Sequence, residues 1–455
     1  MRSEREKSLR GFVWIMILIS CITYTGCKLG FGGDESDGSE DDVSFATDIE
    51  RVSITSVGIQ ANGNSEAPSI SLDGSIVAFI SEATNLVPGD TNDAQDAFVH
   101  DLDTGITERV SVASSGIQGD DDAFTLSLSS NGSFVTFGSF ATNLVAGDTN
   151  DVIDVFVRDR DTGTTERVSI ATAGTQANDE SFSPTISSSG RFVAFRSDAT
   201  NLVVNDTNNN SDIFVRDRTL GVTRRVSVAS DGTQANGDSI LPAISADGRF
   251  VAFSSGASNL VAGDTNNQAD IFVHDRQDDT TVLIVGPAEF SSGSGIIIVA
   301  PSISPDGGFV GLRSNADDLV PGDTNNSFDT FLIDRVTAIA ERSSVSTSEV
   351  EGNSDSSRPS ISSNNRFVVF SSIATNLVSE DTNGFEDVFV RDRDAGRTRR
   401  VSLTFDGSEG DNRSFSAAVS GDHQFVAFTS LAENLVANDT NGFSDIFVIP
   451  NPLRP

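Results

Sequence analysis

Short apolar segments, separated by polar turn residues, recur along almost the whole chain. One unit contains 184–187, 191–195, 212–216 and 225–228, each with Val, Ile or Phe and flanked by Gly, Asn, Asp or Ser. β-Branched and aromatic residues favour strands, and the flanking residues favour tight turns. No window keeps the three-to-four-residue apolar spacing of a helix. The pattern therefore predicts an all-β protein built from units of four strands.

These units repeat with an almost constant period. The tripeptide Asp-Thr-Asn recurs every 58 or 59 residues and covers nearly everything after residue 50, beginning at Asp90, Asp148, Asp206, Asp264, Asp323, Asp381 and Asp439. Four antiparallel strands repeated radially form the blade of a β-propeller. A β-solenoid is the alternative, but its coils are usually shorter and lack four turn-bounded strands. We therefore expect a seven-bladed β-propeller of four-stranded antiparallel blades.

The two ends of the repeat region complement each other. The seventh copy stops at Ile446–Ile449, before Pro450 and Pro452, and no Arg-Val-Ser segment follows it. An unmatched Arg51-Val-Ser-Ile stands before the first copy. If residues 48–54 supply the fourth strand of the last blade, the ring closes and no open sheet edge remains.

Several motifs resemble the TolB-type propeller repeat, also called the WD40-like or PD40 repeat. Ser304-Pro305-Asp306-Gly307 matches its turn, 253–255 its Phe-x-Ser strand, and 212–215 and 445–448 its Asp-Ile-Tyr-Val strand with Phe for Tyr. The resemblance covers residues 48–449 and implies a propeller fold. TolB itself has an additional N-terminal domain and six blades, so the resemblance does not imply a role in the Tol–Pal system.

The first 26 residues are typical of an export signal. Basic residues precede an apolar run from Gly11 to about Ile22, which is shorter than the ~20 residues that span a bilayer. The run ends in Tyr24-Thr25-Gly26-Cys27, which resembles a bacterial lipobox. We expect a signal peptide over 1–26, lipidation at Cys27, a flexible acidic tether over 27–47 and the propeller over 48–455. An ordinary secretory signal or an uncleaved anchor is the alternative.

Composition restricts the function. The net charge of −36 argues against a nucleic-acid surface. Both Cys, both Met, the only Trp and the only Tyr lie in the first 27 residues, and only three His occur. His100 and His274 occupy a strand position that other repeats give to Arg, which suggests a solvated position. We expect a monomeric, lipid-anchored, non-enzymatic module that binds a protein or cell-wall partner at a bacterial envelope. A calcium-dependent glycan-binding propeller, and a hydrolase- or lactonase-like propeller enzyme, are the alternatives.

The long second-to-third loops and the blade-to-blade loops share one face, where binding loops are commonly found. Each long loop reads Asp-Thr-Asn-x-x-x-Asp, and oxygen ligands at positions one, three and seven resemble part of a calcium loop. The alternative is that Asp and Asn form Asx-turns. The candidate Ca²⁺ ligands are Asp90, Asn92, Asp96, Asp148, Asn150, Asp154, Asp206, Asn208, Asp212, Asp264, Asn266, Asp270, Asp323, Asn325, Asp329, Asp381, Asn383, Asp387, Asp439, Asn441 and Asp445.

One unit departs from the pattern. Its fourth strand, 281–285, lacks the usual Arg, and the segment 286–299 replaces the usual Gly-Thr-Gln-Ala-Asn. Phe290, Ile296, Ile297 and Ile298 form a candidate partner-binding cluster if they are exposed. The alternative is that this segment packs down or extends the inner strand of the next blade.

Overall fold

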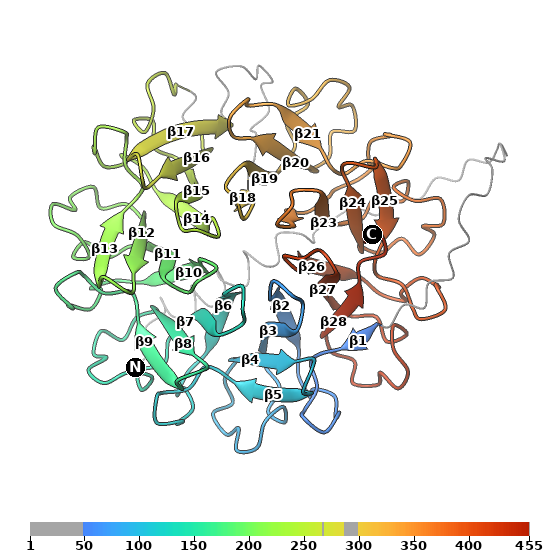
Figure 1. Cartoon of the computed structure of the whole chain (residues 1–455), viewed down its shortest axis with the longest axis horizontal. Helices are drawn as coiled ribbons and strands as arrows, with labels where there is room; N and C mark the ends of the chain where they lie inside the picture. Colours follow the sequence, from blue (N-terminus) through green and yellow to red (C-terminus); the bar gives the residue numbers. More distant parts are fainter. Residues whose placement is uncertain (1–48, 266–267, 286–298, 455) are drawn as a thin grey trace. The chain divides into compact units, whose positions relative to one another are not determined.

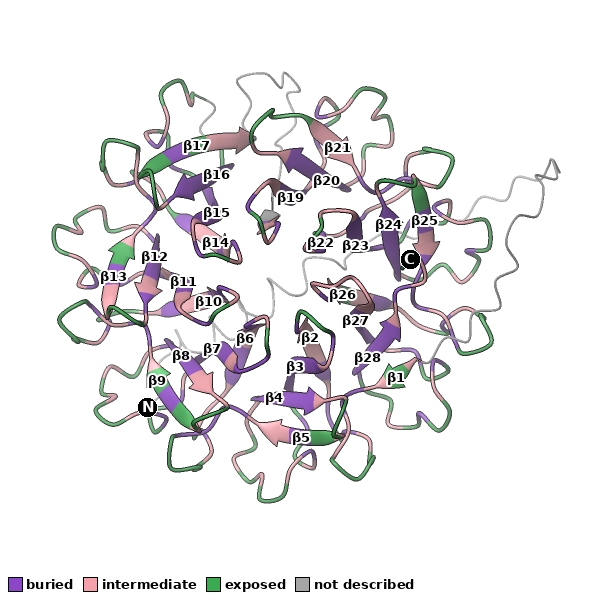
Figure 2. Cartoon of the chain, in the orientation of Figure 1, coloured by how far each residue is buried: buried purple, intermediate pink, exposed green. Residues whose placement is uncertain are grey.

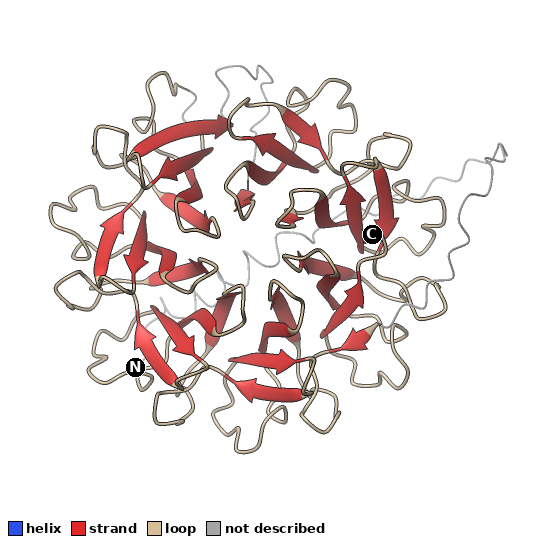
Figure 3. Ribbon diagram, viewed as in Figure 1, coloured by secondary structure: helices blue, strands red, loops and turns tan. Residues whose placement is uncertain are grey.

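The computed structural model describes residues 49–265, 268–285 and 299–454. Within the compact unit Phe45–Pro455, seven four-stranded sheets are arranged radially around a centre (Figure 1). Neighbouring strands pair antiparallel, and strands are the only regular elements of the described residues (Figure 3). The predicted seven-bladed β-propeller is therefore confirmed. The described residues contain no helix long and apolar enough to cross a membrane.

The first strand of each blade lies nearest the centre and the fourth lies outermost. From the inner to the outer strand, the blades consist of β2 (Ser65–Ile70), β3 (Ile76–Ser81), β4 (Asp96–Asp101) and β5 (Ile106–Arg109) in blade 1; β6 (Ala123–Leu128), β7 (Phe134–Ser139), β8 (Asp154–Asp159) and β9 (Thr164–Arg167) in blade 2; β10 (Ser181–Ile186), β11 (Phe192–Ser197), β12 (Asp212–Asp217) and β13 (Val222–Arg225) in blade 3; β14 (Ser239–Ile244), β15 (Phe250–Ser255), β16 (Asp270–Asp275) and β17 (Thr280–Val285) in blade 4; β18 (Val299–Ile303), β19 (Phe309–Ser314), β20 (Asp329–Asp334) and β21 (Ala340–Arg342) in blade 5; β22 (Ser360–Ile361), β23 (Phe367–Ser372), β24 (Asp387–Asp392) and β25 (Arg397–Arg400) in blade 6; and β26 (Ser414–Val419), β27 (Phe425–Ser430), β28 (Asp445–Pro450) and β1 (Glu50–Arg51) in blade 7.

The two middle strands of each blade form the core. All six residues of β3 are buried, because the neighbouring blades cover both faces of the sheet (Figure 2). This explains why these strands read as continuous apolar runs and do not alternate. In blade 1, Phe79 and Phe98 lie opposite each other with stacked rings 5.9 Å apart, and the same pair recurs in most blades. The aromatic pairs hold the two middle strands in register.

The turn after each inner strand connects neighbouring blades. In blade 4, Ser245 donates to Asp247 at 2.7 Å, and Gly248 follows with φ of 74°. A Cβ on Gly248 would overlap the ring of Phe192 in blade 3. In blade 7, His423 takes the same position with φ of 60°, and its ring stacks on Phe367 of blade 6 at 5.2 Å. The Asp-Gly of the repeat therefore meets both a backbone and a packing requirement.

The N-terminal strand closes the ring, as predicted. Arg51 of β1 pairs with Phe447 of β28 in the register that Arg109 and Phe98 have within blade 1. The pairing continues through a hydrogen bond of 2.7 Å from Val52 N to Ile446 O. The ladder is short, since β1 spans only Glu50–Arg51. Hydrogen bonds from farther along the N-terminal segment, such as Gln60 to Thr440, extend the connection.

The glycine requirement can be tested by replacing Gly248 with Ala. The positive φ costs ~1–2 kcal/mol, and overpacking against Phe192 adds ~1–3 kcal/mol. We expect the free energy of unfolding to fall by about 2–5 kcal/mol in denaturant titrations. Gly232→Ala is the control, because Gly232 has φ of 83° but faces open space. This control should lose only about 1–2 kcal/mol, and equal losses would contradict the packing argument.

Candidate functional site

The Asp-Thr-Asn loop of blade 1 closes around an arginine. Nη1 of Arg109, at the end of β5, lies 2.9 Å from Oδ1 of Asp90 and 2.9 Å from Oδ2 of Asp96. Ser111 Oγ donates to Asp96 at 2.5 Å, and Asn92 Nδ2 donates to Asp96 at 3.2 Å. The side chains of both aspartates are 2 % exposed or less. We call this arrangement of two aspartates around one guanidinium the arginine clamp.

The arginine clamp is found in every blade except blade 4. Its Arg–Asp distances range from 2.8 to 3.4 Å, in Arg109–Asp90–Asp96, Arg167–Asp148–Asp154, Arg225–Asp206–Asp212, Arg342–Asp323–Asp329, Arg400–Asp381–Asp387 and Arg51–Asp439–Asp445. The strand register explains the recurrence, because each of these arginines pairs with the phenylalanine two residues after the second aspartate.

The proposed calcium ligands therefore do lie together, but around a guanidinium. Asn92 donates through its amide nitrogen to Asp96, and its oxygen accepts from Ala94 N as in an Asx-turn. The asparagine oxygen accepts such a turn hydrogen bond in five blades, from Ala94, Asn210, Ser327, Phe385 and Phe443. In each clamp the arginine offsets part of the charge of the two carboxylates. The described residues contain no group of three or more His, Cys, Asp or Glu that could hold a metal ion. Asn266 lies outside them.

The clamp also ties the loops of one face together. Arg109 donates through Nη2 to Gln118 of the following blade-to-blade loop at 2.7 Å, and Gln118 donates to Thr91 at 2.9 Å. One arginine thereby fixes the long loop, the outer strand and the connection to the next blade. Sequence reasoning missed this role. The available signal was the fixed spacing between the second aspartate of each loop and the Arg-Val-Ser strand.

The pKa values of several clamp aspartates are raised. Burial raises the pKa of Asp148 to about 6, and Asp154 acts in the same direction while Arg167 opposes the shift. The pKa values of Asp323, Asp381 and Asp439 are also raised to about 6, first by burial. Two carboxylates share one guanidinium, so each clamp retains a net negative charge that a proton can relieve.

The histidine positions correct one expectation from the sequence. His100 and His274 are 1 % and 3 % exposed, so their strand position is buried and not solvated. Each accepts or donates at Nδ1 with a threonine of the outer strand, Thr107 or Thr281, at 2.8–2.9 Å. Burial lowers the pKa of both rings. Arg158 bonds the equivalent threonine in blade 2, because its long side chain also reaches that position.

Two groups of predicted residues lie outside the described part of the chain. One is the proposed partner cluster of Phe290, Ile296, Ile297 and Ile298. The other is the N-terminal region, with the signal peptide, Cys27 and the tether. Lipidation and the partner role of residues 290–298 therefore stay predictions.

Hydroxyl groups join neighbouring blades at five junctions. After blade 7, Ser56 Oγ accepts a hydrogen bond of 2.9 Å from Thr107 N on the outer strand of blade 1. We call this contact the hydroxyl bridge. It recurs at 2.8–3.1 Å in the pairs Ser114–Thr165, Thr172–Thr223, Ser230–Thr281 and Thr347–Thr398.

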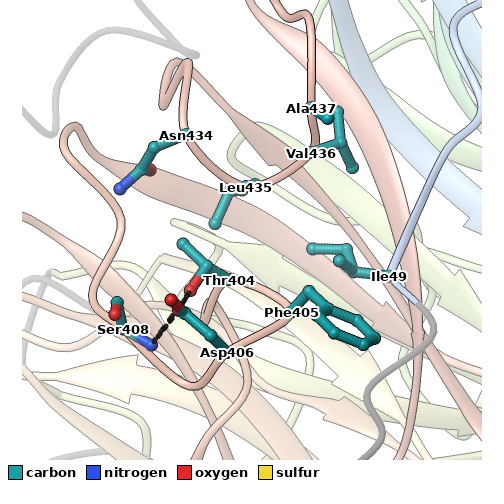
Figure 4. Close-up of a pocket in the computed structure, with 9 residues that line it drawn as sticks. All are labelled: Ile49, Thr404, Phe405, Asp406, Ser408, Asn434, Leu435, Val436 and Ala437. Carbon is teal, nitrogen blue, oxygen red and sulfur yellow. Dashed lines mark hydrogen bonds between the residues drawn. The ribbon is translucent and has the colours of Figure 1, made fainter.

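The junction of blades 6 and 7 replaces the hydroxyl bridge with two apolar residues. Phe405 stands at the serine or threonine position and Ile49 at the threonine position of the outer strand. Both line a cavity of about 540 Å³, together with Leu435, Val436 and Ala437, and with the polar Thr404, Asp406, Ser408 and Asn434 (Figure 4). Phe405 is 65 % exposed. We call this cavity the blade 6–7 pocket.

Two further phenylalanines are exposed in long loops of the same face. Phe385 in blade 6 and Phe443 in blade 7 are 40 % and 37 % exposed, and each follows an Asp-Thr-Asn-Gly sequence. The first three repeats have Ala94, Val152 and Asn210 at that position. Exposed phenylalanine is therefore concentrated in the loops of blades 6 and 7. The sequence contained this signal, but the pocket itself also needs Ile49 from the opposite end of the chain.

The fold resembles that of several solved structures. An oligogalacturonate lyase in complex with manganese matches with a TM-score of 0.54 and 13 % identity over 90 % of this chain and 96 % of that one. The propeller domain of the Trilobed protease from Pyrococcus furiosus, described as having an open velcro topology, gives 0.50 and 12 % over 85 % and 95 %. TolB from Acinetobacter baumannii gives 0.39 and 14 % over 79 % and 76 %.

At these identities the lyase and the Trilobed protease propeller show similarity of fold alone. No protein-family model matches the chain, and no curated sequence does.

The raised pKa of the clamp aspartates predicts a pH effect on stability. Asp148 binds a proton more tightly when folded, at a pKa of about 6, than unfolded, at a pKa of about 3.9. Its contribution therefore raises the free energy of unfolding as the pH falls from 7.5 through 6, and the gain disappears as the pH rises again. Buried His100 and His274 act in the opposite direction, because the unfolded chain protonates first.

A comparison of two variants isolates the contribution of Asp148 to the pH dependence of the Tm. Asp148→Asn should reduce the Tm difference between pH 5.5 and pH 7.5 relative to the unsubstituted protein. Asp161→Asn removes the same charge from an exposed turn residue and should leave that difference unchanged. If both variants change it equally, net charge and not the clamp governs the effect.

Proposed function

We propose that the protein is a non-enzymatic binding module of the bacterial envelope, and that it binds a protein segment through the blade 6–7 pocket. The replacement of the hydroxyl bridge by Phe405 and Ile49 carries this proposal. The other described junctions use polar contacts for the same structural task, so an apolar pair is not required for folding. An aromatic side chain at a pocket is a common anchor of protein interfaces.

Charge indicates the chemistry of the partner. The chain has a net charge of −36, and Asp406 lines the pocket beside Phe405. An acidic surface attracts basic ligands and speeds their association. The partner that fits is therefore a segment with an apolar side chain next to Lys or Arg. The apolar side chain would fill the pocket and the basic side chains would lie over the acidic surroundings.

Catalysis is the weaker alternative. The fold is shared with a lyase and with the propeller domain of a protease. The side-chain hydrogen bonds of the three histidines go to Thr107, Thr281 and Asn364, and none of these pairs includes a carboxylate. A Ser-His-Asp site needs its histidine oriented by a carboxylate. The contacts of the described histidines thus favour binding over hydrolysis.

The pocket proposal can be tested with short peptides and a structure-conserving variant. The double substitution Ile49→Thr and Phe405→Ser gives the junction the residues of the hydroxyl bridges. Peptides with a central Phe or Leu flanked by lysines should bind the full-length protein more tightly than glutamate-flanked ones. Burying such a side chain contributes ~1.5–3 kcal/mol, so the double variant should bind roughly 10–100-fold more weakly in calorimetric titrations.

Leu220→Ser is the matched control, because it removes another exposed apolar side chain, 67 % exposed, from a turn of blade 3. Binding should be unchanged in this variant and should weaken as salt rises. Peptide binding that survives the double substitution would contradict the proposal. Selective binding of neutral oligosaccharides would favour the glycan alternative, in which the Phe405 ring stacks on a sugar beside Asp406 and Asn434.

We also propose that Cys27 anchors the protein by a lipid. The proposal rests on the basic and apolar pattern before Tyr24-Thr25-Gly26-Cys27. Cys27→Ala should move the protein from the membrane fraction to the soluble fraction after cell lysis. Cys21→Ala, in the apolar run, should not. A Cys27→Ala protein that stays uncleaved and membrane-bound would favour an anchor segment.

A further inference from the structure

One basic residue stands on the innermost layer of the propeller, in blade 6. Ser356 forms a bridge with Ser372 that corresponds to the first pair of the inner strand in the other blades, so Arg358 takes the third position of that strand. The other blades have uncharged residues at this position, namely Ala67, Thr125, Ser183, Leu241, Ala300 and Ser416. The construction of an inner strand therefore does not require an arginine.

Solvent reaches the inner strands from the centre of the ring. Neighbouring blades cover both faces of each sheet, and the second strand pairs with the outer side of the first (Figure 1). The residues of β2 after Ser65 are nevertheless only half-buried, and Ser416 of β26 is exposed. Arg358 is exposed as well. Its side chain is therefore open to solvent on the central side of blade 6.

The guanidinium of Arg358 has no partner among the residues that the structure describes. It takes part in no hydrogen bond, ion pair or ring contact there. Desolvation by the surrounding protein lowers the pKa of Arg358, and no carboxylate opposes that effect. Burial lowers the pKa of other arginines too, but nearby carboxylates act in the opposite direction at Arg158, Arg216, Arg276 and Arg313.

A cation that has lost part of its hydration without gaining a counter-charge is in an unfavourable state. The situation is unusual in this chain, whose 66 acidic residues outnumber its 30 basic ones. An anion from outside the described part of the chain would supply the missing counter-charge at Arg358.

We propose that Arg358 binds a carboxylate group of a ligand at the centre of the propeller. The planar guanidinium presents parallel N–H donors that match the two oxygens of a carboxylate. A carboxylate carries one negative charge, which one guanidinium neutralises. A doubly charged phosphate fits less well, because no second basic residue acts on Arg358 and the net charge of −36 repels a dianion more strongly.

The proposal is independent of peptide binding at the blade 6–7 pocket. Arg358 is not among the residues that line that pocket. The two proposals can therefore fail separately.

A fluorinated carboxylate tests the proposal directly. Para-fluorobenzoate should bind the full-length protein, as measured by broadening of its fluorine NMR signal, whereas neutral para-fluorobenzamide should not. Arg358→Ser gives blade 6 the residue of blades 3 and 7. This variant should bind para-fluorobenzoate about 10–100-fold more weakly, because hydrogen bonds to a charged group are lost. Arg224→Ser is the matched control, since it removes another exposed arginine, from the outer strand of blade 3, and should leave binding unchanged.

Thermal unfolding separates ligand binding from a structural role of Arg358. Without ligand, Arg358→Ser should have a Tm equal to or above that of the unsubstituted protein, because it loses an unpaired cation. Para-fluorobenzoate should raise the Tm of the unsubstituted protein and of Arg224→Ser, but not that of Arg358→Ser. A lower Tm of Arg358→Ser without ligand, or equal binding by both proteins or by neither, would overturn the proposal. Tighter binding of inorganic phosphate than of para-fluorobenzoate would overturn it in favour of a phosphate site.

Discussion

The buried arginine between two aspartates is the interaction that holds the Asp-Thr-Asn loops in position on one face of the propeller. Taking three charges out of water is expensive, and a buried ion pair is weak evidence for added stability. Its value lies in geometry, because Nη1 of Arg109 lies 2.9 Å from one oxygen of Asp90 and 2.9 Å from one oxygen of Asp96. Ser111 and Asn92 add donors to the second aspartate. A long loop in another position would leave a buried charge unpaired. The energetic cost of that charge keeps each long loop in one position.

The same interaction closes the ring. In blade 7 the clamp arginine is Arg51, which lies 394 positions before its partner Asp445. The backbone ladder pairs only Glu50 and Arg51 of β1 with β28. The buried ion pair and the Ser53–Asp445 hydrogen bond of 2.5 Å add side-chain connections between the two ends. Closure also brings Ile49 against blade 6, so the blade 6–7 pocket is a consequence of joining the chain ends.

Local sequence patterns predicted the fold because each blade is formed by strands that are close together in the sequence. The turn at Ser304–Gly307 and the stacked pair Phe253–Phe272 connect strands that are adjacent in sequence. The contacts that define the sites are less local. Arg225 reaches Asp206 across 19 positions, and its role depends on a strand register that composition does not reveal. The burial of His100 was likewise hidden, because a position shared with arginine looks solvent-exposed until the neighbouring blade is in place.

Because the chain contains seven copies of one unit, a residue that departs from the shared pattern can be recognised by comparing the blades. In six blades the clamp position holds an arginine, whereas Leu283 occupies that register position in blade 4. At five junctions a hydroxyl group joins neighbouring blades, whereas Phe405, 65 % exposed, stands at that position between blades 6 and 7. The two departures are opposite in kind. One replaces an arginine with an apolar side chain within a blade, and the other replaces a hydroxyl group with an exposed phenylalanine between two blades.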